Sequence, residues 1–347
     1  MVVVPLRAEL LNNDLTQVYI AAVIGRDHGW SHIYSLALQQ QHFAQLHPNG
    51  VFGDGAWYTT GPPYAWLIFP LTLVGPAAAV YIWLGISIAS LFAAWWIAAP
   101  GVGPTRALWL LGAFAWYPVL YGLEFVQPTL VMVLVVAVAW RLADTQKHYL
   151  AGVALGLTAI KPQLVLALPL VLLMAGRWRV LLPYAAIAAV LAVLSLLSLG
   201  TAGLDDYRAT LAHQSQIPNN RYFTLAYVLG PGALSYAAPA IVVAVTAAAA
   251  YLNRHSSYAR LFALAIVASA LSPIYWHLQD FAILVPAAWL FWRDQPPLWQ
   301  RLWLLVVVIG GELAWGLTPL PILVGITLWF AVIVAPRAAP VPVSATA

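Results

Sequence analysis

The residues that could do chemistry in this chain are a few ionisable and amide side chains set in apolar sequence. The stretch GLTAIKPQLVLAL contains one charge, Lys161, and NNDLTQVYIAA, YGLEFVQPT and SPIYWHLQD supply the others. A carboxylate or a histidine can move a proton, and a lysine can hold an anion. Ionisable residues near a membrane core are candidates for function, because a charge in hydrocarbon is costly. The candidates are Asp14, Glu124, Gln127, Lys161, His277 and Asp280.

Each ionisable candidate also has a structural explanation. Asp14 could cap a helix or lie in a solvated loop, and Asp280 could cap the helix that follows it. Lys161 could extend to the membrane surface as an anchor. Glu124 and His277 stand next to aromatic residues and could belong to an interfacial aromatic belt. Residue type alone therefore leaves both explanations open.

The composition excludes a soluble protein. Of 347 residues, 63% are hydrophobic and 7% are charged, whereas a soluble domain has about 25% charged residues. The chain has no cysteine, which excludes disulfides and thiolate metal sites. His28 and His32 are four residues apart but lack a third ligand at a clear spacing. We therefore predict no metal site, although a need for a divalent metal stays open, and no nucleic-acid partner.

The elements that must position the candidates are membrane helices. We predict an all-α polytopic bundle with about eleven spans, several of them shorter than the ~20 residues that a perpendicular helix needs. Residues 149–160 and 163–176 are predicted to form a shallow hairpin that turns at Lys161-Pro162, and residues 64–75 a re-entrant or interfacial piece. The predicted spans are 77–99, 107–121, 128–141, 149–160, 163–176, 180–199, 233–252, 260–272, 280–293, 302–318 and 320–335.

The distribution of basic residues predicts the orientation, because cytoplasmic loops are enriched in lysine and arginine. With residue 100 in the cytoplasm, that side receives Arg106, Arg141, Lys147, Arg177, Arg179, Arg254, Arg260, Arg293, Arg301 and Arg337. The opposite side receives Arg7, Arg26, Lys161, Arg208 and Arg221. The candidates then converge on the extracytoplasmic face of a multi-pass protein of the cell membrane.

This orientation divides the chain into expected regions. Residues 1–335 form a single integral membrane domain, with 1–63 and the loop 200–232 outside and a disordered cytoplasmic tail at 336–347. The apolar start MVVVPL is too short for a signal sequence. We therefore expect a first spanning helix to precede residue 1 in the natural protein.

The order of several segments resembles glycosyltransferase family 87, a family of GT-C type membrane enzymes that use polyprenyl-phosphate sugars. The matching pieces are NDLTQVYIAA, TGPPYAWLIFPL, LEFVQPTLVMVL, YLAGVALGLTAIKPQLVLALPLVLLMAGRWR and SPIYWHLQDFAILVPA. The resemblance covers roughly residues 12–295, and the family's first membrane helix is missing from this chain. Gly61 precedes the Pro-Pro pair where the family has tyrosine, with Tyr58 and Tyr64 nearby.

The resemblance implies a hexosyltransferase that moves a hexose, with mannose as the family-level expectation, to a lipid or glycan acceptor. Asp14 would be the general base, and direct displacement by one base implies inversion at the anomeric carbon. The donor's phosphate and sugar would contact Lys161, His277, Glu124, Gln127, Asp280 and Tyr64. Arg221 and Tyr222 would belong to an outer loop over the acceptor.

Two other classes compete with this prediction. Short broken helices with a cation also suit a transporter or flippase of an anionic or lipid-linked substrate. However, the chain shows no internal repeat, and its candidates gather at one face and not at the midplane. The third class is a non-catalytic homologue in which truncation has removed the helix that positions Asp14.

Overall fold

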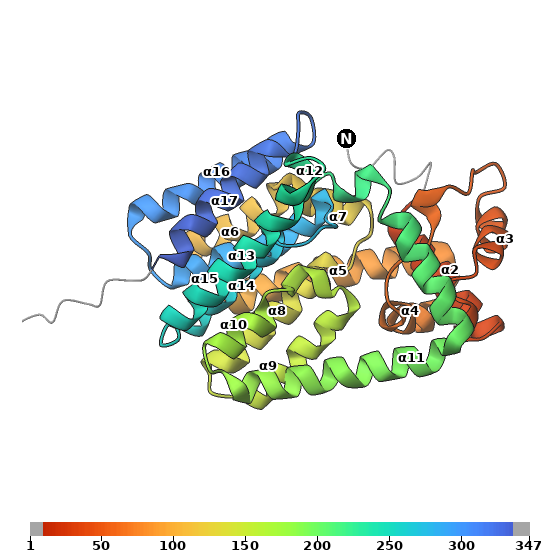
Figure 1. Ribbon diagram of the computed structural model, residues 1–347, viewed down its shortest axis with the longest axis horizontal. Coiled ribbons are helices and arrows are strands. Elements are labelled where there is room, and N and C mark those ends of the chain that lie inside the picture. Colours follow the sequence, from red (N-terminus) through yellow and green to blue (C-terminus); the bar gives the residue numbers. More distant parts are fainter. Residues whose placement is uncertain (1–9, 336–347) are drawn as a thin grey trace, which may run out of the picture.

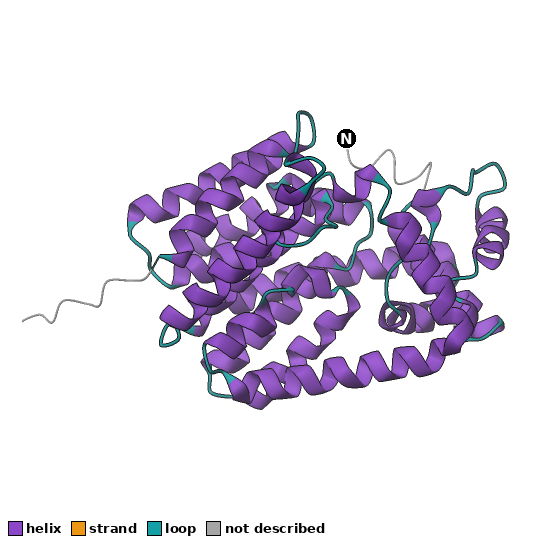
Figure 2. Ribbon diagram, in the orientation of Figure 1, coloured by secondary structure: helices purple, strands orange, loops and turns teal. Residues whose placement is uncertain are grey.

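The computed structural model describes residues 10–335, and over this range the chain forms helices joined by short connections, with no β-strand. Figure 2 shows this all-helical composition directly. Helices satisfy their own backbone hydrogen bonds, which lipid cannot do. The structure thus confirms the predicted all-α membrane bundle. The predicted tail 336–347 lies outside the described residues.

Three of the described helices are long and apolar enough to cross a membrane by length and composition. They are α5 (Pro76–Ala98), α11 (Trp178–Gln214) and α13 (Ala233–Leu252). Shorter apolar helical stretches cover His148–Ile160, Pro162–Met174, Tyr258–Leu271 and Leu320–Val334. The remaining predicted spans are also mostly helical, and 107–121 is broken at Trp116.

The N-terminal part gathers at one end of the molecule (Figure 1). It comprises α2 (Asp14–Asp27), α3 (Leu36–Leu46) and α4 (Pro62–Ile68), with short 3-10 turns at Trp30–His32, Asp54–Ala56 and Phe69–Leu73. Helix α2 packs on α4 and buries Leu15, Val18, Ile20 and Ile24. This packing fixes the first turn of α2, where Asp14 lies.

The middle of the chain contains two breaks that matter for the site. Helices α6 (Gly103–Ala115) and α7 (Tyr117–Glu124) replace the predicted single span 107–121, because the chain is extended at Trp116 and Pro118 favours a new helix start. After α8 (Thr129–Asp144) come α9 (His148–Gly156), two 3-10 turns (Leu157–Ile160 and Pro162–Val165) and α10 (Leu168–Met174). Lys161 separates the two turns, where the sequence predicted a break.

Helix α11 runs along one edge of the molecule (Figure 1). It packs closely on α9, where a Cβ at Gly152 would collide with the carbonyl oxygen of Val180. It changes direction at Gly200, which has a φ of 61°. The helix then continues to Gln214, so the first half of the predicted loop 200–232 is helical. Packing of Gly203 against the backbone of Ser31 favours this helical extension.

The C-terminal half contains a helix that is buried along nearly its whole length. After a 3-10 turn (Pro218–Arg221) and α12 (Leu225–Val228), α13 leads to α14 (Tyr258–Leu271), whose residues from Ala259 to Leu271 are all buried. A 3-10 turn (Leu278–Ile283) then leads into α15 (Leu284–Arg293), α16 (Leu298–Ala314) and α17 (Leu320–Val334). Helix α14 packs against α8, α13, α15 and α17.

Candidate functional site

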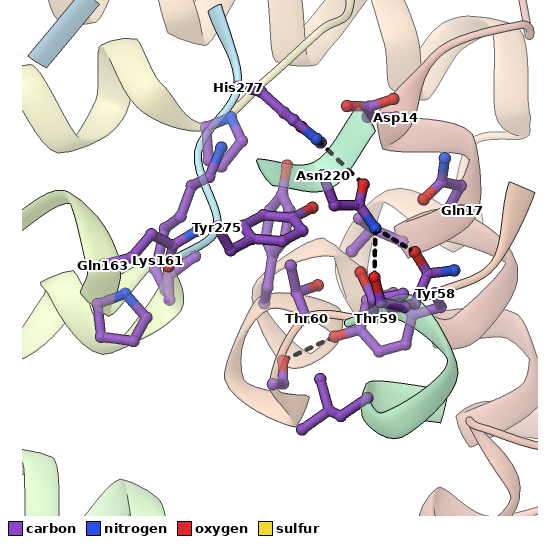
Figure 3. A pocket seen from close by; sticks show the side chains of 18 of the residues that line it. Asp14, Gln17, Tyr58, Thr59, Thr60, Lys161, Gln163, Asn220, Tyr275 and His277 are labelled. Atoms are coloured by element: carbon purple, nitrogen blue, oxygen red, sulfur yellow. Dashed lines mark hydrogen bonds between the residues drawn. The ribbon is translucent and has the colours of Figure 1, made fainter. Parts of the chain in front are cut away.

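A cavity of about 600 Å³ lies where the N-terminal helices meet the rest of the bundle. Segments distant in the sequence contribute polar side chains to its wall, several of which Figure 3 labels. The polar lining includes Asp14, Gln17, Tyr58, Tyr64, Gln127, Lys161, Gln214, Asn220, Arg221, Tyr275 and His277. Four of the six candidates from the sequence line the cavity, namely Asp14, Gln127, Lys161 and His277. A fifth, Asp280, lies directly behind the wall.

Asp14 occupies the first position of α2 and is half-buried at the cavity wall. The helix cap is its neighbour Asn13, whose side chain accepts the Thr16 backbone N–H at 3.2 Å, so Asp14 is not the cap. The Asp14 backbone N–H donates to the carbonyl oxygen of Phe125 at 3.2 Å. Burial raises the pKa of Asp14 to about 6, although Lys161 and the amide of Gln127 pull it down. A carboxyl with that pKa suits proton abstraction near neutral pH.

Gln127 connects the carboxylate to the cation. Its Nε2 donates to Asp14 Oδ2, and its Oε1 accepts from Lys161 Nζ at 2.7 Å. The amide has both a donor and an acceptor, one for each of these partners. The backbone presents it through a turn that ends α7, in which Gln127 N–H donates to the Gly122 oxygen at 2.9 Å and Val126 has a φ of 54°.

Lys161 forms a buried ion pair. Its Nζ lies 2.5 Å from Asp280 Oδ1, and the two side chains are 7% and 0% exposed. Asp280 also accepts the His277 backbone N–H at 3.1 Å, as the third residue of a capping box in which His277 is the cap, so Asp280 is not the cap of a following helix. Asp280 does not line the cavity, whereas Lys161 does. The carboxylate therefore compensates the lysine charge from behind the wall, and Lys161 is not extended to a membrane surface.

His277 contacts the part of the cavity wall that contains Asn220. Its Nε2 lies 3.2 Å from Asn220 Oδ1, and Asn220 Nδ2 donates to Gln214 Oε1 at 2.7 Å and to the Gln214 carbonyl oxygen at 3.0 Å (Figure 3). Burial lowers the pKa of His277, which favours a neutral imidazole. The asparagine thus ties the end of α11 to the segment before α15.

Of the other expected site residues, two line the cavity and two do not. Tyr64 is buried and lines the cavity, and Arg221 also lines it. Tyr222 packs on Phe223 and Tyr227, and Glu124 is exposed at the end of α7; neither lines the cavity. The structure therefore does not bring Glu124 to the other candidates.

Several lining residues were missed from sequence. Gln17, Gln214, Asn220 and Tyr275 all face the cavity. The one local signal is the polar run QSQIPNNR, which interrupts an otherwise apolar chain. Among the described residues, no group of three or more His, Asp or Glu side chains could hold a metal ion.

The fold and the cavity define a helical membrane protein with an acid–amide–cation network facing an internal polar space. The model of glycosyltransferase family 87 matches residues 58–276, more than half of the chain, and the protein therefore belongs to this family. A comparison with curated proteins gave no match. A comparison with solved structures also gave none. The matched range includes Gln127, Lys161 and Arg221, whereas Asp14, His277 and Asp280 lie outside it.

Proposed function

We propose that this membrane glycosyltransferase moves a hexose, with mannose as the first candidate, from a polyprenyl-phosphate sugar to a lipid or glycan acceptor. Membership of family 87 supports glycosyl transfer. The observation that carries the rest is the cavity itself, which places a carboxyl of raised pKa beside basic side chains. An acceptor hydroxyl and a leaving phosphate need these two kinds of group.

In the proposed step, the acceptor hydroxyl oxygen attacks the anomeric carbon of the donor sugar. The new C–O bond forms as the bond between that carbon and the phosphate oxygen breaks. The hydroxyl proton passes to Asp14, and the electron pair of the broken bond stays on the polyprenyl phosphate. This single displacement inverts the anomeric carbon and needs no covalent intermediate.

The neighbouring network positions the base. Gln127 bonds one oxygen of Asp14, so the other oxygen is directed to the acceptor. Lys161 holds Gln127 in place and supplies a positive field near the donor. His277 and Tyr64 are proposed sugar contacts, because both line the same cavity. Asp280 acts through Lys161.

The orientation completes the proposal. The excess of basic residues on one side supports a cytoplasmic C-terminus and a cavity at the extracytoplasmic face of the cell membrane. The helical extension Gly200 to Gln214 then lies on the outside, beside the acceptor.

Asp14→Asn tests the proposal. The amide cannot take a proton, so we expect a loss of about 10²–10⁴-fold in transfer from radiolabelled polyprenyl-phosphate mannose, measured in membranes. Glu124→Gln is the matched control, since it removes the same charge at an exposed position outside the cavity. Near-normal transfer by Asp14→Asn removes Asp14 from the mechanism. Net solute movement in proteoliposomes without sugar transfer indicates a transporter.

A further inference from the structure

Arg221 differs from the other cation of the cavity wall in its electrostatic balance. The charge of Lys161 is matched by Asp280 at 2.5 Å. By contrast, no carboxylate among the described residues lies within ion-pair distance of Arg221, and its buried Nε has no hydrogen-bond partner. An unsatisfied guanidinium nitrogen in a partly buried position is costly. The cavity therefore contains one cation that lacks an anion.

Hydrogen bonds hold the backbone of Arg221 at this wall. Its carbonyl oxygen accepts both the backbone N–H of Thr224, at 3.0 Å, and the Thr224 hydroxyl, at 2.7 Å. The preceding residue, Asn220, bonds Gln214 and His277 through its side chain, and its carbonyl accepts the Trp276 N–H at 3.1 Å. The backbone beside the guanidinium is thus tied to two walls of the cavity, which is an arrangement typical of a preorganised binding group.

We propose that Arg221, and not Lys161, is the principal ligand of the donor's phosphate, an inference that rests on the proposed function. A guanidinium presents several N–H donors in a plane and matches phosphate oxygens in a bidentate manner. The bridging phosphate carries one negative charge in the donor and gains a second as its bond to the sugar breaks. Arg221 therefore binds the phosphate more tightly as the reaction proceeds, while Lys161 orients Gln127 and Asp14. Arg221 is then a donor contact and not the acceptor contact that the family resemblance implied.

The test compares binding of polyprenyl phosphate with binding of the neutral polyprenol, by native mass spectrometry of the purified protein. We expect Arg221→Gln to weaken polyprenyl phosphate binding by about ten- to a hundredfold and to leave polyprenol binding unchanged. Arg221→Lys keeps the charge, so its affinity for polyprenyl phosphate should lie between that of the wild-type protein and that of Arg221→Gln. Arg208→Gln is the matched control, because Arg208 is exposed, pairs with Asp205 and lies outside the cavity.

Three results would overturn the inference. The first is that Arg221→Gln binds polyprenyl phosphate as tightly as the wild-type protein does. The second is that Arg221→Gln loses as much affinity for polyprenol as for polyprenyl phosphate. The third comes from kinetics: an increased KM for the acceptor with an unchanged donor KM would show that the phosphate belongs to the acceptor. The expected pattern is a higher donor KM and a lower kcat.

The same measurements separate this inference from the proposed function. If the wild-type protein binds polyprenyl phosphate through Arg221 but transfers no sugar, the phosphate site stands and the transferase mechanism falls. If sugar transfer depends on Asp14 while Arg221→Gln keeps the wild-type donor KM, the transferase stands and the role of Arg221 falls.

Discussion

At the scale of single residues, Gln127 explains how opposite charges share one cavity without a direct ion pair. Asp14 and Lys161 each bond the amide, and no ion pair joins the two. A direct contact would hold the pKa of Asp14 low, because a close cation favours the carboxylate. With the amide between them, burial dominates and the carboxyl stays basic enough to act.

The raised pKa of Asp14 predicts an acid limb in the rate profile. The base must be ionised, so kcat/KM should be constant well above pH 6 and fall about tenfold per pH unit below it. The measurement is kcat/KM for the acceptor between about pH 4.5 and 8, with the acceptor below saturation. If the fall of kcat/KM at low pH disappears in a His277→Gln variant, the titrating group is the histidine and not Asp14.

At the scale of elements, the site depends on irregular breaks between helices. Lys161 lies between two 3-10 turns, Gln127 follows the turn that ends α7, and Asp280 lies in the 3-10 turn before α15. Such breaks free polar backbone and side-chain groups, which membrane proteins tolerate only where protein or a cavity surrounds them. The buried pair of Lys161 and Asp280 joins two of these breaks.

Removing one member of that pair should destabilise the protein. Asp280→Asn leaves a buried lysine without its counter-charge, and we expect a loss of roughly 3–5 kcal/mol in the free energy of unfolding. Thermal unfolding in detergent measures this loss of stability. Asp205→Asn, which breaks an exposed pair with Arg208, should change little. The double variant Lys161→Met/Asp280→Asn should regain stability; a single variant as stable as wild type would contradict the role of the pair.

Close packing of α9 on α11 gives a second prediction at this scale. In Gly152→Ala, the new methyl group meets the Val180 carbonyl, and overpacking of this kind costs about 1–3 kcal/mol. The Tm in detergent should fall accordingly. Gly85→Ala in α5 is the control, since nothing lies within 4 Å of a Cβ there. Equal behaviour of the two variants would show that α9 and α11 are not in tight contact.

At the scale of the whole molecule, the cavity forms where the N-terminal helices meet the bundle. Its lining runs from Asp14 to His277, so most of the chain must fold before the site exists. The outer half of α11 packs on the turn at Trp30–His32 and so joins the N-terminal part to the bundle.

The absence of native cysteine allows a direct test of orientation. A single cysteine at Asp205, which is 75% exposed, should react with a membrane-impermeant maleimide in intact cells. Lys147→Cys, in the exposed connection before α9, should react only after permeabilisation. The reverse pattern would place the cavity at the cytoplasmic face.

The sequence by itself determined the fold class and the positions of most helices. Its apolar runs are long, and hydrophobic burial in lipid requires helices whatever the neighbours are. It also indicated the break at Lys161, because a charge followed by proline interrupts an apolar helix. The helical extension to Gln214 escaped prediction, since that stretch is polar and is helical through packing on Ser31.

Only the tertiary structure decided which candidates meet. Glu124 and Gln127 are three residues apart, yet one is exposed and the other joins Asp14 to Lys161. The difference arises from the left-handed turn at Val126, which sends consecutive side chains in different directions. Likewise, Lys161 has Asp280 as an ion-pair partner, whereas Arg221 has no carboxylate partner within residues 10–335. Charge compensation across more than a hundred residues is a property of packing, which local sequence does not encode.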